Sequence, residues 1–480
     1  MQEEQYPIEI SSSINGHWIG DTGFGGEQVL NPATGQVLGE LAHVGPSDLD
    51  QALDAADCGW RNWSARAVDE RSAILHEAAG ILDKKADQIA AMLSREQGKP
   101  LVQARGDVAG GIALLRLHAE EAKRTYGRTL VRQPGQRASV TYEPVGPAAG
   151  FAPWNFPFFN VARKVAPALA AGCAIIVKPA EETPASAAAL QQALLDAGVP
   201  GSASQLVYGN PAQVSDHLLA SPIIRKVSFT GSVPVGKQIA KLAADGVKRT
   251  TLELGGHAPV IIFDDADLDR SLDMLVTAKF RNAGQVCVSP TRFYIQEGIY
   301  DRFAAGFVER TERRVCVGDP FAEKTVMGPL ANNRRTSAMA QLVNDARGSG
   351  AKILAGGEAI DGRGHFFQPT VIADVPSTAR IMNDEPFGPV AAISRFRTFD
   401  EAIEMGNRLP YGLAAYVFTQ SLNRALRASD ALEAGMVAVN SVTLSTGDAP
   451  FGGIKESGQG MEDGPEGLHA YLVPKVIHIG

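Results

Sequence analysis

The sequence predicts an α/β protein whose main part is a doubly wound parallel sheet. Between residues 146 and 263, short apolar runs alternate with stretches of helical periodicity. Such alternation is typical of parallel strands joined by crossover helices of about ten to fifteen residues. The 480 residues, of which 45% are hydrophobic, suffice for two or three domains with their own cores. Sheets of this class bind ligands at the carboxyl ends of their strands.

The region before this sheet is expected to be mainly helical. Residues 14–40 predict short strands and turns, because Gly, Asn and Pro interrupt the apolar residues. From 47 to 95, and again from 101 to about 122, apolar residues recur every three or four positions, which predicts helices. Apolar and polar residues alternate from 126 to 145, which predicts a hairpin or an extended arm.

The first strand predicted with its own helix is 174–177, whose β-branched residues suit a fully buried parallel strand. Thr183 and Pro184 then predict a helix start, with Thr183 as the N-cap, and the helix should end near 198. Further strands are expected at 206–208 and 226–229, with helices at 211–220 and 231–244. A second α/β block should begin with a strand at 259–263 and a helix at 267–280, and continue to about 440; residues 471–478 should form a strand.

Charge and composition exclude several classes of protein. A net charge of -8 and a pI near 5.7 argue against a nucleic-acid partner. No run approaches the ~20 apolar residues that cross a bilayer, so we expect no membrane association. The cysteines are scattered without metal-ligand spacing, which predicts no metal site. With few cysteines and a polar N-terminus unlike a secretory signal, we expect a cytoplasmic protein.

Three motifs supply the groups needed to oxidise an aldehyde through a covalent thioester. They are Pro153-Trp154-Asn155-Phe156-Pro157, Glu253-Leu254-Gly255-Gly256 and Asn282-Ala283-Gly284-Gln285-Val286-Cys287. The Cys287 thiolate would attack the carbonyl carbon, and the Asn155 amide would stabilise the oxyanion. Glu253 among apolar neighbours should have a raised pKa, which suits a base that activates water. Because a free thiol is little ionised at neutral pH, we expect the surroundings of Cys287 to assist its ionisation.

With these motifs in this order, the chain resembles the NAD(P)-dependent aldehyde dehydrogenase superfamily over nearly its whole length. The resemblance implies a Rossmann-type cofactor domain, an α/β catalytic domain and a small β oligomerisation arm. On that basis we expect a discontinuous NAD-binding domain at 1–125 and 146–255 and a catalytic domain at 256–440. Bridging segments are expected at 126–145 and 441–480, and a homodimer or homotetramer is implied by the resemblance alone.

The resemblance also implies a set of residues for the cofactor. Lys178 and Glu181 match the adenosine-ribose segment, and Glu181 favours NAD over NADP because it would repel a 2′-phosphate. Gly231 and Ser232 precede a predicted helix whose N-terminus suits a pyrophosphate. Glu385 and Phe387 match the segment at the nicotinamide ribose. Trp154, Gly209 and Leu254 complete the expected set, and NADP remains possible.

The substrate is expected to be a carboxylated semialdehyde, either succinate semialdehyde or α-ketoglutaric semialdehyde. Arg163 and Ser445 match substrate-contacting positions of that subgroup, and Arg292 is a further candidate. Guanidinium groups near the thiol would recognise the distal carboxylate. Glu462 falls where many family members carry a second Glu that assists proton relay.

Alternative functions remain open at this point. The chain could oxidise a broader range of aliphatic or aromatic aldehydes. It could be a CoA-acylating semialdehyde dehydrogenase. Transfer of the acyl group to CoA needs no base to activate water, however, so Glu253 would then have no catalytic role. It could also be a catalytically silent binding protein, against which the complete set of Cys287, Glu253, Asn155 and Lys178 argues.

Overall fold

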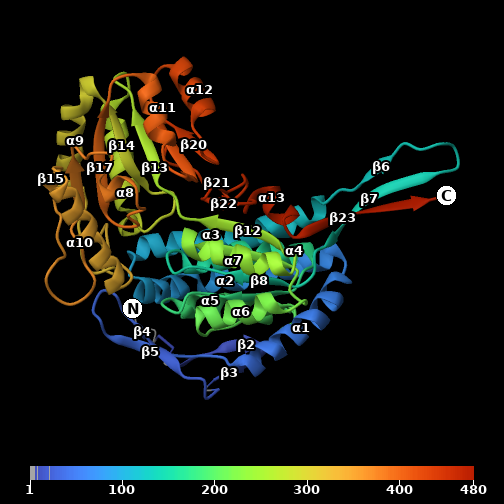
Figure 1. Ribbon diagram of the computed structural model, residues 1–480. Coiled ribbons are helices and arrows are strands. Elements are labelled where there is room, and N and C mark those ends of the chain that lie inside the picture. The colour runs from blue at the N-terminus through green and yellow to red at the C-terminus, as the bar shows by residue number, and fades with distance from the viewer. Residues whose placement is uncertain (1–5, 8, 21) are drawn as a thin grey trace.

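An eight-stranded sheet forms the centre of the larger lobe of the computed structural model, which describes residues 6–7, 9–20 and 22–480 (Figure 1). Residues 1–5 of the polar N-terminal segment lie outside the described part. The five middle strands are parallel in the order β12-β11-β8-β9-β10, and antiparallel strands extend both edges. The strands are β2 (Ser12–Ile14), β3 (His17–Ile19), β8 (Ala148–Phe151), β9 (Ile175–Lys178), β10 (Ser204–Leu206), β11 (Lys226–Gly231), β12 (Arg249–Leu254) and β22 (Gly458–Gln459).

Helices cover both faces of this sheet, as the strand–helix alternation predicts. Side chains of β9 alternate between two cores: Ile175 and Val177 belong to one, and Ile176 belongs to the other. The first core is shared with α2 (Val68–Gln97), α3 (Leu101–Glu121), α4 (Pro157–Ala171) and α5 (Pro184–Asp196). The second core is shared with α1 (Pro46–Ser64), α6 (Pro211–Ala220) and α7 (Val233–Asp245).

The predicted start of α5 is confirmed, but its capping group is not the expected one. Thr183 makes no side-chain hydrogen bond to the first turn. Instead the buried carboxylate of Glu96 accepts from the main-chain amides of Ala185 at 2.9 Å and Ser186 at 3.0 Å. Since Glu96 lies on α2, the helix start is fixed by a residue far away in the sequence, which local capping rules do not reveal.

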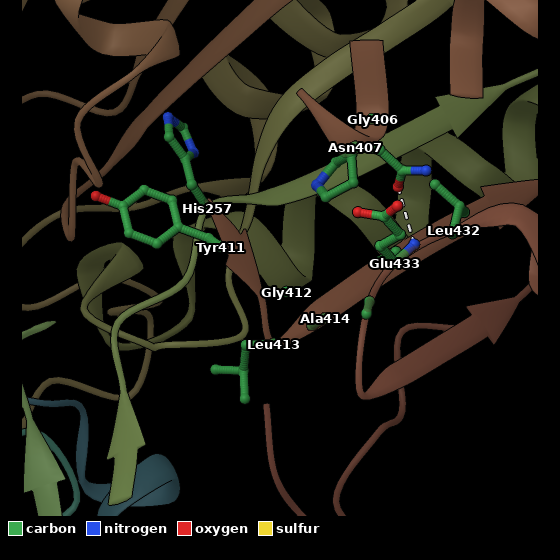
Figure 2. A pocket seen from close by; sticks show the side chains of 12 residues that line it. His257, Gly406, Asn407, Tyr411, Gly412, Leu413, Ala414, Leu432 and Glu433 are labelled. Carbon is green, nitrogen blue, oxygen red and sulfur yellow. Dashed lines mark hydrogen bonds between the residues drawn. The ribbon is translucent and has the colours of Figure 1, made fainter. Parts of the chain in front are cut away.

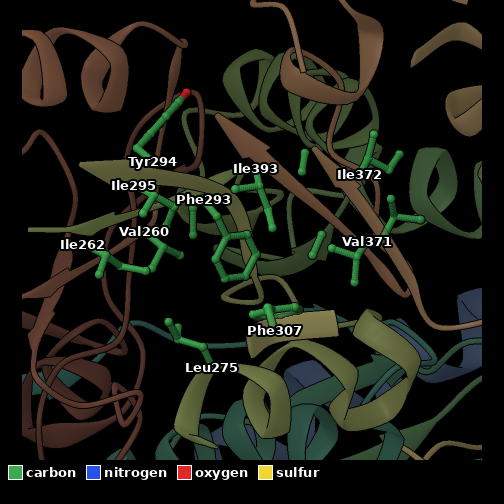
Figure 3. Close-up of a cluster of buried hydrophobic side chains, with 14 of the residues drawn as sticks. Val260, Ile262, Leu275, Phe293, Tyr294, Ile295, Phe307, Val371, Ile372 and Ile393 are labelled. Atoms are coloured by element: carbon green, nitrogen blue, oxygen red, sulfur yellow. The ribbon is translucent and has the colours of Figure 1, made fainter. Parts of the chain in front are cut away.

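A seven-stranded sheet forms the second lobe (Figure 1). Its order is β15-β16-β17-β14-β13-β19-β20, parallel throughout except for the edge strand β15. Figure 3 shows its core, where Val260, Phe293 and Ile393 from three strands meet Leu275 and Phe307 from two helices. The elements are β13 (Ala258–Ile262), β14 (Pro290–Gln296), β15 (Lys352–Ala355), β16 (Thr370–Ala373), β17 (Val390–Phe396), β19 (Ala414–Phe418), β20 (Met436–Val439), α8 (Leu268–Phe280), α9 (Tyr300–Arg314), α10 (Asn333–Gly348), α11 (Phe399–Asn407) and α12 (Leu422–Ala431).

A third sheet projects from the body as an arm (Figure 1). It pairs β7 (Arg137–Pro144) with β6 (Arg128–Leu130) and β23 (Leu472–Ile479), so the hairpin predicted at 126–145 and the strand predicted at 471–478 are confirmed. Only β23 of the expected bridging segment 441–480 lies in the arm. Within that segment, β22 joins the larger sheet, β21 (Ile454–Lys455) pairs with β18 (Tyr411–Gly412), and α13 (Gly464–His469) packs on α3 and α4.

A small sheet of β1 (Glu9–Ile10), β4 (Gly26–Leu30) and β5 (Val37–Ala42) lies at the N-terminal end of the described chain. None of the helices in the described ranges is long and apolar enough to cross a membrane.

Candidate active site

Cys287 lies in the loop between α8 and β14, and the backbone before it is unusual. Asn282, Ala283 and Gly284 all have positive φ, at 49°, 52° and 71°. For residues with a Cβ this conformation is unfavourable and persists only where the surroundings hold it. A Cβ at Gly284 would collide with the main-chain oxygen of Gly388. The nucleophile loop is therefore pressed against the segment that follows Glu385, which the sequence analysis assigned to the nicotinamide.

The amide side chain of Asn155 lies beside this loop. Asn155 follows β8 and is buried, and its Nδ2 donates to the main-chain oxygen of Gln285 at 3.1 Å, two residues before Cys287. Its own main-chain oxygen accepts from Asn282 Nδ2 at 2.9 Å. The structure thus brings together the two motifs that the sequence analysis assigned to the nucleophile and the oxyanion donor.

A buried ion pair behind Asn155 was not predicted from the sequence. Lys99 Nζ donates to the Asn155 main-chain oxygen at 2.8 Å and to Asp107 Oδ2 at 2.7 Å, and both charged side chains are inaccessible to solvent. The other Asp107 oxygen accepts from the main-chain amide of Phe159 in the first turn of α4 at 2.8 Å. These contacts fix the loop that carries Asn155. Lys99 directly follows Gly98 at the end of α2, where sequence alone suggests a solvated residue.

Glu253 is held in an apolar setting at the end of β12. It is only 3% exposed, and neither carboxylate oxygen has a hydrogen-bond partner among the described residues. A Cβ on Gly452 would lie 3.0 Å from its Oε1 and 2.4 Å from Met461 Sδ, so only glycine fits beside this carboxylate without displacing a neighbour. Burial, and next the nearby charge of Glu462, raise the pKa of Glu253 well above its ordinary value. This confirms the raised pKa expected from the sequence.

The expected assistance to the Cys287 thiol is not present in the chain alone. Cys287 is half-buried against Phe451, Leu413 and Met436. Burial raises the pKa of the thiol to about 12, Glu385 adds to this, and Arg163 opposes it. The expectation of surroundings that favour ionisation is therefore wrong, because burial of the thiol and the charge of Glu385 outweigh the effect of Arg163. A base must take the proton as the thiol attacks.

Glu462 lies close to Glu253 but has different partners. Lys164 Nζ and Ser228 Oγ each donate to its Oε1 at 2.8 Å. Burial favours the neutral acid, but the charges of Lys164 and Arg163 outweigh it and lower the pKa of Glu462. The site therefore holds one carboxyl that tends to be protonated and one that tends to be ionised.

Arg163 and Ser445 come together, as the sequence predicts, but around a third residue. Arg163 forms a two-pronged ion pair with Asp463, with Nε to Oδ1 at 2.8 Å and Nη2 to Oδ2 at 2.6 Å. The same Nη2 donates to Ser445 Oγ at 3.1 Å. The guanidinium also lies between the rings of Phe159 and Phe451, at 4.4 and 4.2 Å from their centroids. Asp463 was not anticipated from the sequence.

The structure contradicts a substrate contact for Arg292. Its guanidinium is buried and donates to the main-chain oxygens of His257 at 2.8 Å, Met405 at 3.1 Å and Gly406 at 3.0 Å. His257 and Gly406 line a small pocket within the second lobe (Figure 2). Because every nitrogen of Arg292 is used to hold these loops, this residue stabilises the lobe. Its position five residues after Cys287 was misleading because β14 carries it away from the thiol.

The larger sheet offers a groove that fits a dinucleotide. The strand order reverses between β8 and β11, and ligands bind at such a switch point beyond the carboxyl ends of the strands. The loop after β8 carries Trp154, and β11 ends at Gly231. Ser232 is the N-cap of α7 and makes no side-chain cap bond, so the amides of the first helical turn remain available to an anion.

The other residues expected at the cofactor lie around this edge. Lys178 ends β9 and its ammonium pairs with Glu181. Gly209 follows β10 and Leu254 ends β12. Glu385 accepts from the Gly256 amide at 3.2 Å, and the Phe387 ring meets Trp154 edge to face with centroids 5.5 Å apart. All nine expected residues are thus on or beside one edge of the sheet, which fits an extended cofactor.

Comparisons with known proteins agree with this geometry. The model of the aldehyde dehydrogenase family matches residues 18–477. The chain belongs to the aldehyde dehydrogenase family. It is 46% identical to 4-(hydroxymethyl)benzenesulfonate dehydrogenase TsaD1 from Comamonas testosteroni over 94% of each chain, and 40% identical to succinate-semialdehyde dehydrogenase [NADP(+)] GabD from Escherichia coli over 97% of each. The crystal structure of succinate-semialdehyde dehydrogenase from Burkholderia pseudomallei superimposes with a TM-score of 0.96 at 39% identity, covering 98% of both chains.

The protein is accordingly an aldehyde dehydrogenase that uses NAD+ or NADP+. The fold expected from the resemblance is confirmed. Within the described ranges, no group of three or more His, Cys, Asp or Glu side chains could hold a metal ion.

Arg281 is a residue of this aldehyde dehydrogenase site that sequence reasoning missed. It directly follows α8, six residues before Cys287, and is exposed. Its guanidinium lies over the ring of Phe156 at 5.2 Å from the centroid, next to the oxyanion motif. Its main-chain amide donates to Thr277, but its side chain has no hydrogen bond or ion pair to another described residue, unlike that of Arg163. The available signal was its place directly before the nucleophile motif.

Proposed function

We propose that this enzyme oxidises aldehydes that carry an acid group at the end remote from the carbonyl. The observation that carries the proposal is Arg281, an exposed guanidinium beside the nucleophile loop without a carboxylate partner in the described chain. Arg binds carboxylate and sulfonate oxygens through paired N–H donors. The names of the relatives support an acid group, since one refers to a benzenesulfonate and another to succinate semialdehyde. Carboxylated semialdehydes belong to this class.

The residues divide the chemistry among them. The Cys287 sulfur attacks the carbonyl carbon, and the free N–H of the Asn155 amide, with the main-chain amide of Cys287, stabilises the oxyanion. Glu253 takes the thiol proton, releases it to solvent, and then removes a proton from the water that hydrolyses the thioester. A nicotinamide dinucleotide, which Trp154, Glu385 and Phe387 would hold, would supply the acceptor for the hydride. Because Glu253 activates water, the acyl group of the thioester is released as a carboxylic acid and is not transferred to CoA.

NAD+ is the cofactor that Glu181 favours. Its carboxylate, held by Lys178 at the end of β9, would accept ribose hydroxyls and repel a 2′-phosphate. The name of the relative from Escherichia coli specifies NADP+, so the preference rests on this carboxylate and its partner in the chain.

A homodimer or homotetramer is the assembly that the arm supports. Strand β23 is the outer strand of the arm sheet, and its Val476, Ile477 and Ile479 side chains are between 38% and 61% exposed. An exposed strand edge with apolar side chains favours pairing with another chain.

The acid preference is tested by replacing Arg281. We expect Arg281→Gln to lower kcat/KM for 4-carboxybenzaldehyde about 10- to 100-fold, since one charge-assisted hydrogen bond contributes about 1.5–3 kcal/mol. The rate with benzaldehyde, which has the same ring without the acid, should change less than about threefold. Comparing the two substrates isolates the effect of the acid group on kcat/KM from effects on the rest of the reaction.

Arg302→Gln is the matched control, because Arg302 is exposed on α9 in the second lobe. It should leave the ratio of the two substrates unaltered. Equal losses with both aldehydes in Arg281→Gln would show instead a general aldehyde dehydrogenase.

A further inference from the structure

Asp463 is held in a backbone conformation that is rare for a residue with a side chain. Its φ is 58° and its ψ is 175°, a region that glycine occupies without strain and other residues seldom enter. The residue is completely buried, and its main-chain oxygen accepts from the Gly467 amide at 2.7 Å. Such a conformation persists only where other contacts hold it.

The contacts that hold Asp463 are those with Arg163 and Ser445. Both carboxylate oxygens accept from the Arg163 guanidinium, and the Ser445 hydroxyl lies 3.4 Å from Oδ2. Two nitrogens of Arg163 are therefore directed at Asp463, and its two faces are covered by Phe159 and Phe451. A carboxylate at this distance cancels the positive charge that the guanidinium would present to a substrate.

Arg163 is close enough to the reacting thiol for this cancellation to matter. Its guanidinium lies over Phe451, which belongs to the apolar cluster against which Cys287 packs, and its charge lowers the pKa of the thiol. An unpaired guanidinium there would attract any anionic substrate. The second guanidinium of the site, Arg281, has no such carboxylate in the described chain.

We propose that Asp463 is a specificity-determining residue that masks Arg163 and leaves Arg281 to recognise the acid group of the substrate. The inference rests on the proposed oxidation of acid aldehydes and adds that only one of the two cations takes part. Asp463 acts through Arg163 and does not contact the substrate. Removing its carboxylate leaves Arg163 with only the longer contact to Glu462, at 4.0 Å, so that a second guanidinium becomes available to an acid group.

The test measures the ratio of kcat/KM for an acid aldehyde to that for its neutral counterpart. The substrates are succinate semialdehyde with butanal, and 4-carboxybenzaldehyde with benzaldehyde. Asp463→Gly also relieves the backbone strain, and Asp463→Asn keeps the shape but loses the charge. We expect the acid-to-neutral ratio to rise about tenfold or more in at least one substrate pair, through a lower KM for the acid aldehyde. A purely structural role would change both members of each pair alike.

Binding without turnover supplies a second measurement. Sodium succinate, compared with succinamide at equal ionic strength, should raise the Tm of Asp463→Gly or Asp463→Asn more than that of the parent. In the double variant Arg281→Gln/Asp463→Gly, the freed Arg163 should restore part of the acid preference lost in Arg281→Gln.

The inference is overturned if the folded variants show the parent ratio and no added stabilisation by succinate. Failure of the proposed function gives a different result. In that case Arg281→Gln leaves the parent ratio unaltered, while the Asp463 variants still acquire a preference for acid aldehydes that the parent lacks.

Discussion

Glu253 and Glu462 are two carboxyl groups of one site that are buried to nearly the same degree, at 3% and 4% exposure. The pKa of Glu253 is raised well above its ordinary value, whereas that of Glu462 is lowered. Burial raises the pKa of both carboxyl groups. The difference comes from partners, since Glu462 accepts from Lys164 and Ser228 while the oxygens of Glu253 accept from no described residue.

The comparison shows how one site keeps a base and a fixed charge side by side. A carboxyl with a raised pKa exchanges a proton near neutral pH, which suits general-base catalysis. A carboxylate fixed by a lysine stays ionised and contributes a constant field. Because Glu462 is ionised, its charge is the second cause of the raised pKa of Glu253. The two roles therefore depend on each other, and each can be altered separately.

The largest effect is expected from Glu253→Gln. The amide keeps the shape of the side chain but cannot accept a proton, so steady-state turnover should fall about 10²- to 10⁴-fold. If Glu253 acts mainly in hydrolysis of the thioester, rapid mixing should still show a burst of NADH close to one equivalent per site. The measurement is stopped-flow absorbance with a saturating aldehyde.

Glu462→Gln is the companion variant, and its loss should be smaller because the residue exchanges no proton with the substrate directly. If Glu253→Gln turned over within tenfold of the parent, the assignment of Glu253 as the general base would be wrong.

A second, intermediate effect is expected from Lys164→Met. Loss of the ammonium removes the charge that holds Glu462 ionised, so the pKa of Glu462 should rise. Because the same ammonium also lowers the pKa of Glu253 directly, we expect kcat to fall about 10- to 100-fold at neutral pH and the acid limb of the pH–rate profile to move to higher pH. A pH profile of kcat between 5 and 9 provides the measurement.

Lys226→Met is the matched control for this variant. Lys226 is as buried as Lys164 and lies on β11, but its ammonium donates to Thr251 Oγ1 at 2.7 Å. Because Lys226 acts on Glu462 through its charge but makes no hydrogen bond to it, its removal should reduce stability and shift the acid limb less than Lys164→Met does. An equal shift in both variants would mean that loss of a buried lysine, rather than of the partner of Glu462, alters the profile.

The sequence predicted the elements that depend on local patterns and missed those that depend on distant partners. Strand β9 and helix α8 were expected at 174–177 and 267–280, and both lie within about one residue of these bounds. Cys287, Glu253 and Asn155 were found because each sits in a short motif. Asn155 contacts the loop that carries Cys287, and the charge of Glu253 acts on the thiol.

The missed residues share a different property. Asp463 pairs with a residue 300 positions away, and Lys99 with one 56 positions away. No local periodicity or spacing reports such pairs. The error at Arg292 has the same origin, because proximity to Cys287 along the chain says nothing about the direction in which β14 carries the side chain. The reaction class could therefore be predicted from the sequence, whereas the ion pairs between distant residues could be found only in the structure.

The smallest effect concerns stability, and it has opposite signs for the two glutamates. An unfolded glutamate loses its proton near pH 4.5, whereas folded Glu253 retains it to higher pH. Stability contributed by this group therefore falls as pH rises from about 4.5 through the folded pKa, because unfolding then releases a proton. Glu253→Gln lacks this penalty, and its Tm at pH 8 should exceed that of the parent by about 1–3 °C.

Folded Glu462 has a lowered pKa, so its contribution is present above about pH 4.5 and is lost as the pH falls through the folded pKa. Glu462→Gln should therefore be less stable than the parent at pH 8, and both variants should approach the parent below pH 4. Calorimetry across this range measures the two differences. If both variants differed from the parent in Tm with the same sign at pH 8, the two carboxyl groups would share one charge state. The assignment of Glu253 as base and Glu462 as fixed charge would then be wrong. Tm differences of opposite sign would link stability to catalysis. The burial that raises the pKa of Glu253, and so suits it to act as a base, would be the same burial that lowers the stability of the protein.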